Sequence, residues 1–102
     1  MIRSVIRLQV EPGREREFEE QFRGRGVLRR AREAARLRTG ELLRPIAGGP
    51  YVVVATWDSV EDYAAWVNSP IRGELSATAP QLSQPVAPAD LYEIVEQFEA
   101  PE

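Results

Sequence analysis

Residues 51–75 read YVVVATWDSVEDYAAWVNSPIRGEL, and their hydrophobic period changes from that of a strand to that of a helix. Residues 51–57 are almost continuously apolar and rich in β-branched side chains, which is typical of a strand. Ser59 follows, with Asp62 three positions later, and this capping-box pattern predicts the start of a helix. The large apolar side chains after the cap recur on one helical face: Tyr63, Trp66 and Val67.

The residues before this stretch predict two strands and a long helical segment. Residues 2–10 alternate apolar and polar side chains, which indicates a half-buried strand. Residues 14–38 are helical in composition, and Gly40 is placed to close that helix in a left-handed conformation. Residues 41–47 predict a second strand. The Gly-Gly-Pro at residues 48–50 then predicts a hairpin with the strand that follows.

The residues after it predict a second short helix and a last strand. Pro70 suits the first position of a helix that runs to Thr78. A proline-rich loop over residues 79–88 leads to a strand over residues 90–98. The complete order is strand, helix, hairpin, helix, strand, which is the ferredoxin-like βαββαβ arrangement. We therefore expect one α+β domain over residues 1–102, with an antiparallel sheet and its helices on one face.

The long helical segment does not keep one apolar face. An unbroken helix would place Phe18 and Phe22 on the same stripe as several arginines, while the later apolar residues would lie on roughly the opposite side. The apolar face must therefore change phase near Gly24 and Gly26, since glycine weakens a helix. This pattern predicts a break, kink or bulge at these glycines.

Two predicted strands are apolar on both faces: the second strand of the hairpin, over residues 51–57, and the last strand, over residues 90–98. In residues 51–57 the odd positions oppose the even ones, yet both sets are apolar. A sheet with one face in water should alternate cleanly instead. The pattern predicts that a second sheet, from an identical subunit, covers the open face and forms a homodimer.

The composition excludes several kinds of chemistry. The chain has no histidine and no cysteine, and all 13 of its basic side chains are arginines. This removes the usual metal ligands, the imidazole base, the thiolate nucleophile and the Schiff-base lysine. The net charge of −3 argues against nucleic-acid binding. The absence of a long apolar run predicts no signal peptide and no membrane span, so we expect a cytoplasmic protein.

Residues 51–75, with the strand GELLRPI before them, resemble the antibiotic biosynthesis monooxygenase family. In that family a strand ends in Trp, an acidic residue and Ser, and the next helix holds Tyr and a second Trp. The matching residues are Trp57, Asp58, Ser59, Tyr63 and Trp66. The resemblance implies a dimeric α+β barrel. It also implies one of several activities: cofactor-independent oxidation of polyketide phenols to quinones, heme degradation, or polyketide cyclisation.

Two branches of the family differ from this chain at particular positions. In the heme-degrading branch Trp66 matches the active tryptophan, but Ile6 and Ser76 stand where an asparagine and a histidine are expected. In the quinone-forming branch Trp57 and Tyr63 match. There Val53 replaces an asparagine, and Ser76 or Ala77 stands at an arginine position, with Arg72 nearby. The missing histidine removes the axial ligand of the heme-degrading branch and argues against heme degradation.

The leading interpretation is a cofactor-independent, metal-free monooxygenase that acts on an aromatic, polyketide-type phenol. The candidate catalytic residues are Trp66, Tyr63 and Arg72. The candidate substrate-binding residues are Trp57, Tyr51, Asn68 and Ser76. The competing structural interpretation is that the aromatic residues only fill the core between helix and sheet. The competing functions are a polyketide cyclase and a noncatalytic small-molecule-binding dimer.

The arginines between residues 23 and 38 also have two interpretations. They are typical of a solvated helical face, since arginine is mostly exposed in folded proteins. The alternative is docking of an acidic acyl carrier protein or an anionic substrate, which would depend on salt.

Overall fold

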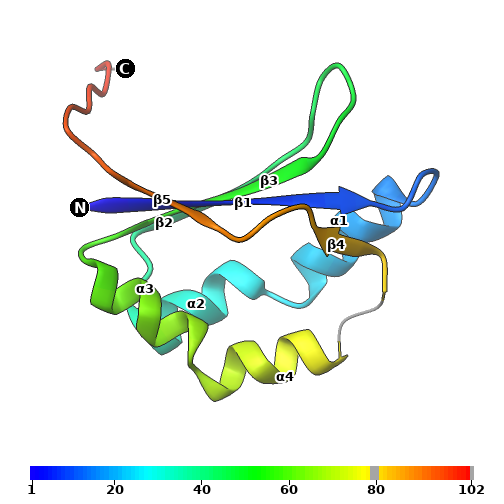
Figure 1. The fold of residues 1–102 in the computed structure, drawn as a ribbon, viewed down its shortest axis with the longest axis horizontal. Coiled ribbons are helices and arrows are strands. Elements are labelled where there is room, and N and C mark those ends of the chain that lie inside the picture. The colour runs from blue at the N-terminus through cyan, green and yellow to red at the C-terminus, as the bar shows by residue number, and fades with distance from the viewer. Residues whose placement is uncertain (79–80, 102) are drawn as a thin grey trace.

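The computed structural model describes residues 1–78 and 81–101, which form one antiparallel sheet with the helices on one of its sides (Figure 1). The elements, in chain order, are β1 (Ile2–Val10), α1 (Glu15–Gly24), α2 (Val27–Ala35), β2 (Thr39–Leu43), β3 (Tyr51–Trp57), α3 (Val60–Val67), α4 (Pro70–Thr78), β4 (Ser83–Pro85) and β5 (Asp90–Glu93). The predicted α+β architecture is therefore confirmed. No described helix is long and apolar enough to cross a membrane.

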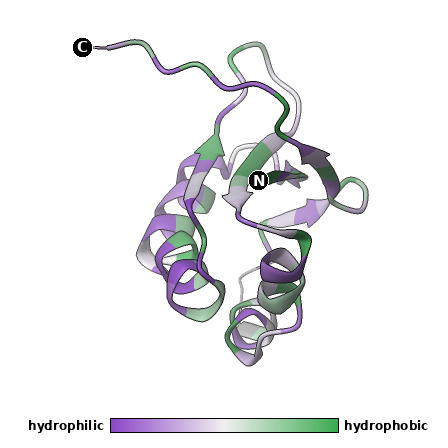
Figure 2. Ribbon diagram, turned by 90° about the vertical axis from the view of Figure 1, so that its left-hand side faces the viewer, coloured by the Kyte–Doolittle hydropathy of each residue, from purple (hydrophilic) through white to green (hydrophobic). Residues whose placement is uncertain are grey.

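The strand β1 is the centre of the sheet. It pairs with β3 along most of its length, and β3 pairs with β2 on its far side. On its other edge, β1 pairs with β4 near its C-terminal end and with β5 near its start. Figure 2 shows the same two layers after a 90° turn, with the helices in two columns beneath the strands.

Several predicted boundaries are confirmed, and others are wrong. β1, β3 and α4 have the predicted bounds, and Ser59 caps α3 by accepting a hydrogen bond from the Asp62 N–H at 3.2 Å. The second strand covers Thr39–Leu43 instead of residues 41–47. The last strand ends at Glu93 instead of residue 98, because no described strand pairs with the residues after it. The short β4 lies inside the predicted proline-rich loop, of which residues 79 and 80 fall outside the described residues.

The predicted break in the first helical segment is confirmed. α1 ends at Gly24 and α2 begins at Val27, and Gly26 between them has a left-handed backbone with φ of 61°. The break lets Phe18 of α1 and Ala31 of α2 both become buried under the sheet. The expected role of Gly40 was wrong, since Arg36 closes α2 in the left-handed conformation. Gly40 lies in β2, where a Cβ atom would come within 2.8 Å of the Leu28 side chain.

The core consists of two clusters that lie under opposite ends of the sheet. The first contains Ala31, Ala35, Leu37, Ala55, Trp57 and Trp66. The second contains Val10, Phe18, Tyr51 and Leu82. Trp57 is 1% exposed, and its indole N–H donates to the Ser4 hydroxyl at 3.0 Å, so the ring is fixed by packing and by a buried hydrogen bond.

The sheet face opposite the helices carries apolar side chains that no described element covers. The register places Val52 opposite Arg7 and Val54 opposite Val5, on the side away from the helices. Leu43 and Tyr92 share this face by the same pairing, and both are exposed. In the single chain this open face therefore combines apolar side chains with polar ones such as Arg7.

The glycines at the helix break give a matched pair of stability predictions. Gly26→Ala should lower the free energy of unfolding by about 1–2 kcal/mol, because alanine is strained at positive φ. Gly24→Ala should leave stability unchanged or raise it by up to about 1 kcal/mol, because alanine favours a helix and a Cβ atom there meets nothing within 4 Å. Urea denaturation measures both. Equal effects of the two substitutions would contradict the left-handed role of Gly26.

Candidate functional site

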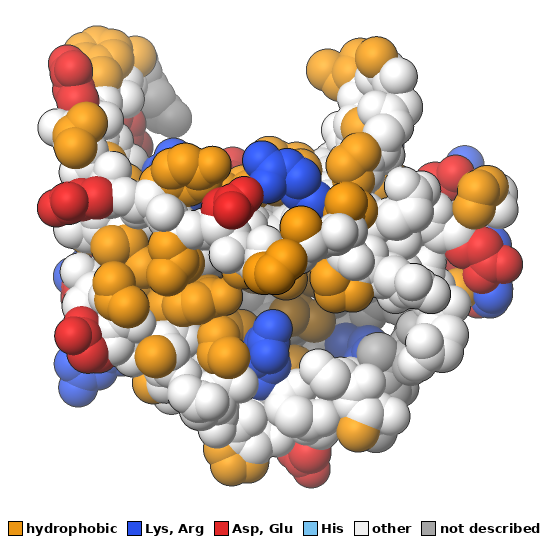
Figure 3. Space-filling view, viewed as in Figure 1, with side chains coloured by type: hydrophobic (Ala, Val, Ile, Leu, Met, Phe, Trp, Pro, Cys, Tyr) orange, Lys and Arg blue, Asp and Glu red, His pale blue; other side chains and the backbone are white. Residues whose placement is uncertain are grey.

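A cavity of about 300 Å³ lies between the helices and the sheet, bordered by both core clusters. Its wall is mostly apolar, and β1, β3, all four helices and residues 82–89 contribute to it. Figure 3 shows the hollow beneath the sheet, with basic side chains next to it. A largely apolar cavity of this size with a few polar groups is the usual form of a small-molecule site.

Aromatic side chains form the wall near α3. The rings of Trp57 and Tyr63 meet edge to face, with centroids 5.8 Å apart and an interplanar angle of 71°. Trp66 lies one helical turn after Tyr63 and also lines the cavity. The Ser59 cap sets where α3 begins, and therefore which residues of that helix face the sheet. The aromatic core and the aromatic cavity wall are thus the same residues.

Three polar groups in the wall have no partner among the described residues. The Tyr63 hydroxyl, the Trp66 indole N–H and the Arg72 guanidinium make no hydrogen bond or ion pair there. Arg72 lies in the first turn of α4, where its backbone N–H donates to the Ser69 hydroxyl at 3.1 Å. The aromatic hydroxyl, the indole donor and the cation are therefore available to a ligand in the cavity.

The structure brings five of the seven candidate residues together. The residues that line the cavity are Trp57, Tyr63, Trp66, Arg72 and Ser76. Asn68 does not line it, because its side-chain amide donates to the Ala64 carbonyl at 2.9 Å and closes α3 on the exposed surface. Tyr51 does not line it either, since its hydroxyl points into a separate polar cluster. Ile6 and Val53, at the two positions where an asparagine was expected from the family branches, also border the cavity.

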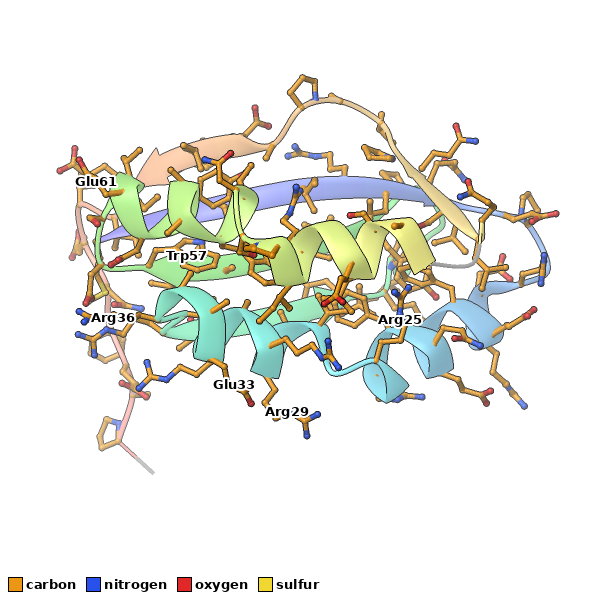
Figure 4. The ribbon with its side chains drawn as sticks, turned by 90° about the horizontal axis from the view of Figure 1, so that it is seen from below. Arg25, Arg29, Glu33, Arg36, Trp57 and Glu61 are labelled. Atoms are coloured by element: carbon orange, nitrogen blue, oxygen red, sulfur yellow. The ribbon has the colours of Figure 1, made fainter. Side chains whose placement is uncertain are left out.

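Arg25 is a wall residue that the sequence interpretation placed on a solvated face. It follows α1 directly, and its guanidinium donates to the Leu75 carbonyl of α4 (Figure 4). The left-handed Gly26 next to it ends α1 and changes the direction of the chain. The feature of the sequence that could have indicated this position of Arg25 is the change of apolar face at Gly24 and Gly26. Because the helix breaks there, Arg25 does not belong to the regular row of exposed arginines.

The other arginines of residues 23–38 have different roles. Arg38 forms a bidentate pair with Asp58, with nitrogen–oxygen distances of 2.8 and 3.1 Å. Arg32 donates to the Leu37 carbonyl at 3.1 Å, beyond the end of α2. Arg29 lies on the exposed side of α2, 3.9 Å from Glu33. All arginines of residues 23–38 except Arg25 are exposed, so the prediction of a solvated face is confirmed for them. Docking of an acidic carrier protein stays a prediction.

Tyr51 belongs to a polar cluster in which Tyr51 and Glu19 are buried and Arg44 is exposed. The Tyr51 hydroxyl donates to Glu19 at 2.5 Å, and Arg44 donates to both carboxylate oxygens of Glu19 at 2.5 and 2.6 Å. These bonds, the one from Arg44 above all, lower the pKa of Glu19 from its ordinary 4.5 to about 2. Burial and the neighbouring carboxylate raise the pKa of Tyr51. This cluster connects α1 to the start of β3 and to the loop after β2.

Comparisons with known proteins agree with this architecture. The sequence profile of antibiotic biosynthesis monooxygenases matches residues 1–75. The heme-degrader MhuD from Mycobacterium tuberculosis is similar in structure, with a TM-score of 0.81 and 24% identity over 97% of this chain and 100% of MhuD. SnoaB, a cofactor-independent oxygenase from Streptomyces nogalater, has a TM-score of 0.75 and 19% identity over 97% of each chain. At these identities both likenesses establish the fold alone. A comparison with curated proteins gives no match.

The Glu19 cluster gives a prediction about acid stability. A carboxyl whose folded pKa is lowered stabilises the fold above its ordinary pKa, and this contribution is lost as the pH falls toward 2. Glu19→Gln should therefore destabilise the protein at neutral pH by about 2 kcal/mol. The difference from the wild type should shrink at about pH 3.

The control for this measurement is Glu17→Gln. Glu17 pairs with Arg14 at 2.8 Å on the exposed surface, so its loss should change the stability much less than the loss of Glu19. Urea midpoints at the two pH values measure both variants. An equal deficit of Glu19→Gln at both pH values would contradict the proposed ionisation.

Proposed function

The chain belongs to the antibiotic biosynthesis monooxygenase family, and from this premise we propose that it is a cofactor-independent monooxygenase that oxidises an aromatic, polyketide-type phenol to a quinone. One observation carries the proposal: the aromatic-walled cavity holds a hydroxyl, an indole N–H and a guanidinium without partners among the described residues. Such a cavity excludes water around a flat apolar ligand while it keeps donors for the ligand's oxygens.

The proposed reaction needs no external reductant. The ionised phenol transfers an electron to O2, and the two radicals combine at the activated ring carbon. Loss of water then leaves a carbonyl, so one oxygen atom enters the product. The other leaves as water, with the one hydrogen of that carbon and the proton that the phenol lost on ionisation. The substrate supplies all the electrons. The protein contributes orientation, a dry environment and stabilisation of the anion.

The residues of the wall suit separate parts of this reaction. Arg72 stabilises the phenolate, since a guanidinium stays charged and offers planar hydrogen bonding. Tyr63, whose ring lies in the wall beside the Trp57 ring, relays the proton through its hydroxyl. Trp57 and Trp66 bound the ring system of the substrate, and Ser76 adds a hydroxyl to the wall. The proposed site therefore keeps five candidates, while Tyr51 and Asn68 lie outside the cavity.

A heme-degrading activity like that of MhuD does not fit these residues. Heme iron is held by histidine, cysteine, methionine or tyrosine. The chain has no histidine or cysteine. Among the described wall residues, Tyr63 is the only side chain of a ligating type, and its ring already packs against Trp57.

A noncatalytic binding function is the second candidate. Ile6 and Val53 make the sheet side of the cavity wall apolar. An apolar side chain cannot donate the hydrogen bond that an asparagine would give to a developing oxyanion. The same cavity would then bind an aromatic ligand without turnover. A cyclase would use it without oxygen.

We also propose that two copies pair through the open sheet face. In Figures 1 and 3 the loop between β2 and β3 and the C-terminal segment rise on either side of that face. Both projections carry exposed apolar side chains: Ile46 on the loop, and Val95 and Phe98 near the C-terminus. Burial of such a side chain contributes about 1.5–3 kcal/mol. A second copy supplies a matching apolar face by symmetry.

The oxygenase proposal predicts oxygen uptake with a panel of hydroxylated anthrones and naphthacenones. Uptake should persist after exhaustive chelation. Arg72→Gln should reduce it about tenfold or more, because it removes the charge that stabilises the phenolate, and should leave the melting temperature nearly unchanged. Arg29→Gln is the control, since Arg29 lies outside the cavity wall. If these compounds bind but none consumes oxygen, the binding function replaces the oxygenase.

The dimer proposal predicts that Val54→Arg produces a monomer. Val54 lies in the middle of β3 on the open face, and Glu41 is directly opposite it, so the single chain can accept the new charge. Val60→Arg is the control, because Val60 begins α3 on the helical side. Sedimentation equilibrium at micromolar concentration measures both. A monomeric wild-type protein would contradict the proposal.

A further inference from the structure

The charge of the cavity wall differs from that of the whole chain. The chain has 16 acidic residues and 13 arginines, for a net charge of −3. The described wall residues include Arg25 and Arg72 but no aspartate or glutamate. Among the described residues, two cations and no acid thus line this apolar cavity of an acidic protein.

Several arginines outside the cavity wall are paired with acids. The described ion pairs include Arg7 with Asp90, Arg14 with Glu17, Arg38 with Asp58 and Arg44 with Glu19. Arg72 has no such pair among the described residues, although it is only partly exposed. A cation that is partly removed from water without an anion is costly unless a ligand supplies one.

One of the two cavity arginines, Arg72, belongs to α4, and the other, Arg25, contacts that helix. The Arg25 guanidinium donates to the Leu75 carbonyl. Leu75 is three residues after Arg72, and residues at that spacing are neighbours on one face of a helix. Both residues also line the cavity. Both arginines therefore belong to the part of the wall that lies at α4.

From this arrangement we infer that the ligand of the cavity is an aromatic acid, whose carboxylate binds between Arg25 and Arg72. The inference rests on the proposed function for the phenolic ring and adds the acidic group. A carboxylate suits this position because guanidinium groups bind it through paired, charge-assisted hydrogen bonds. Arg25 and Arg72 then determine specificity, by favouring an acid over a neutral compound of the same shape.

A purely structural role of Arg25 makes a different prediction. Its bond to Leu75 stabilises the last turn of α4, where a cation also interacts favourably with the helix dipole. If this were its whole function, Arg25→Gln would lower stability without changing the preference for acids. The ratio of two affinities therefore separates the two roles.

The experiment compares a hydroxynaphthoate with its uncharged amide. Calorimetric titration under nitrogen measures both dissociation constants without any turnover, so the result does not depend on oxygenase activity. The wild type should bind the acid about tenfold or more tightly than the amide. Arg72→Gln and Arg25→Gln should each remove most of that preference and leave the affinity for the amide within about threefold.

Two further variants complete the test. Arg25→Lys keeps the positive charge and should retain part of the preference, whereas Arg29→Gln removes a charge outside the cavity and should retain all of it. Equal affinity of the wild type for acid and amide, or no binding of the acid, overturns the inference. A preserved acid preference without oxygen uptake would overturn the oxygenase proposal alone.

Discussion

The left-handed turn at Gly26 is the constraint on which the helical layer depends. It ends α1 and lets α2 begin with a new orientation, so that Phe18 and Ala31 are buried under the same sheet. A continuous helix would have directed arginines into the core on one side of the break. The turn therefore gives both helices an apolar face toward the sheet, and it places Arg25 at the cavity wall.

The cavity follows from the way the two core clusters fill the layer. Large rings occupy both ends of the sheet, with Trp57 and Trp66 in one cluster and Phe18 and Tyr51 in the other. The first cluster also contains alanines at positions 31, 35 and 55. Their small side chains fill little of the space next to the tryptophans. The space between the clusters remains as the cavity. The aromatic residues thus have one physical role in stability and can have another in ligand binding.

A polar side chain that is bonded to other residues holds the fold together, whereas one without a partner among the described residues can bind a ligand. Tyr51 and Tyr63 show the difference. The Tyr51 hydroxyl is bound to Glu19, which Arg44 also holds, so this tyrosine is committed to joining α1 and β3. The Tyr63 hydroxyl has no partner among the described residues and belongs to the cavity wall. Residue type alone did not separate them.

The sequence by itself determined the order of elements, the helix break and most of the aromatic wall, because these depend on local periodicity, on the Ser59 cap and on glycine. It did not determine that Asn68 closes a helix, that Tyr51 bonds to Glu19, or that the Gly at position 40 makes room for Leu28. It also missed β4, whose pairing with β1 joins residues about 75 positions apart. Only the tertiary structure decided these points, since each depends on which distant residue supplies the partner. The same reason applies to Arg25, whose role follows from the approach of α4.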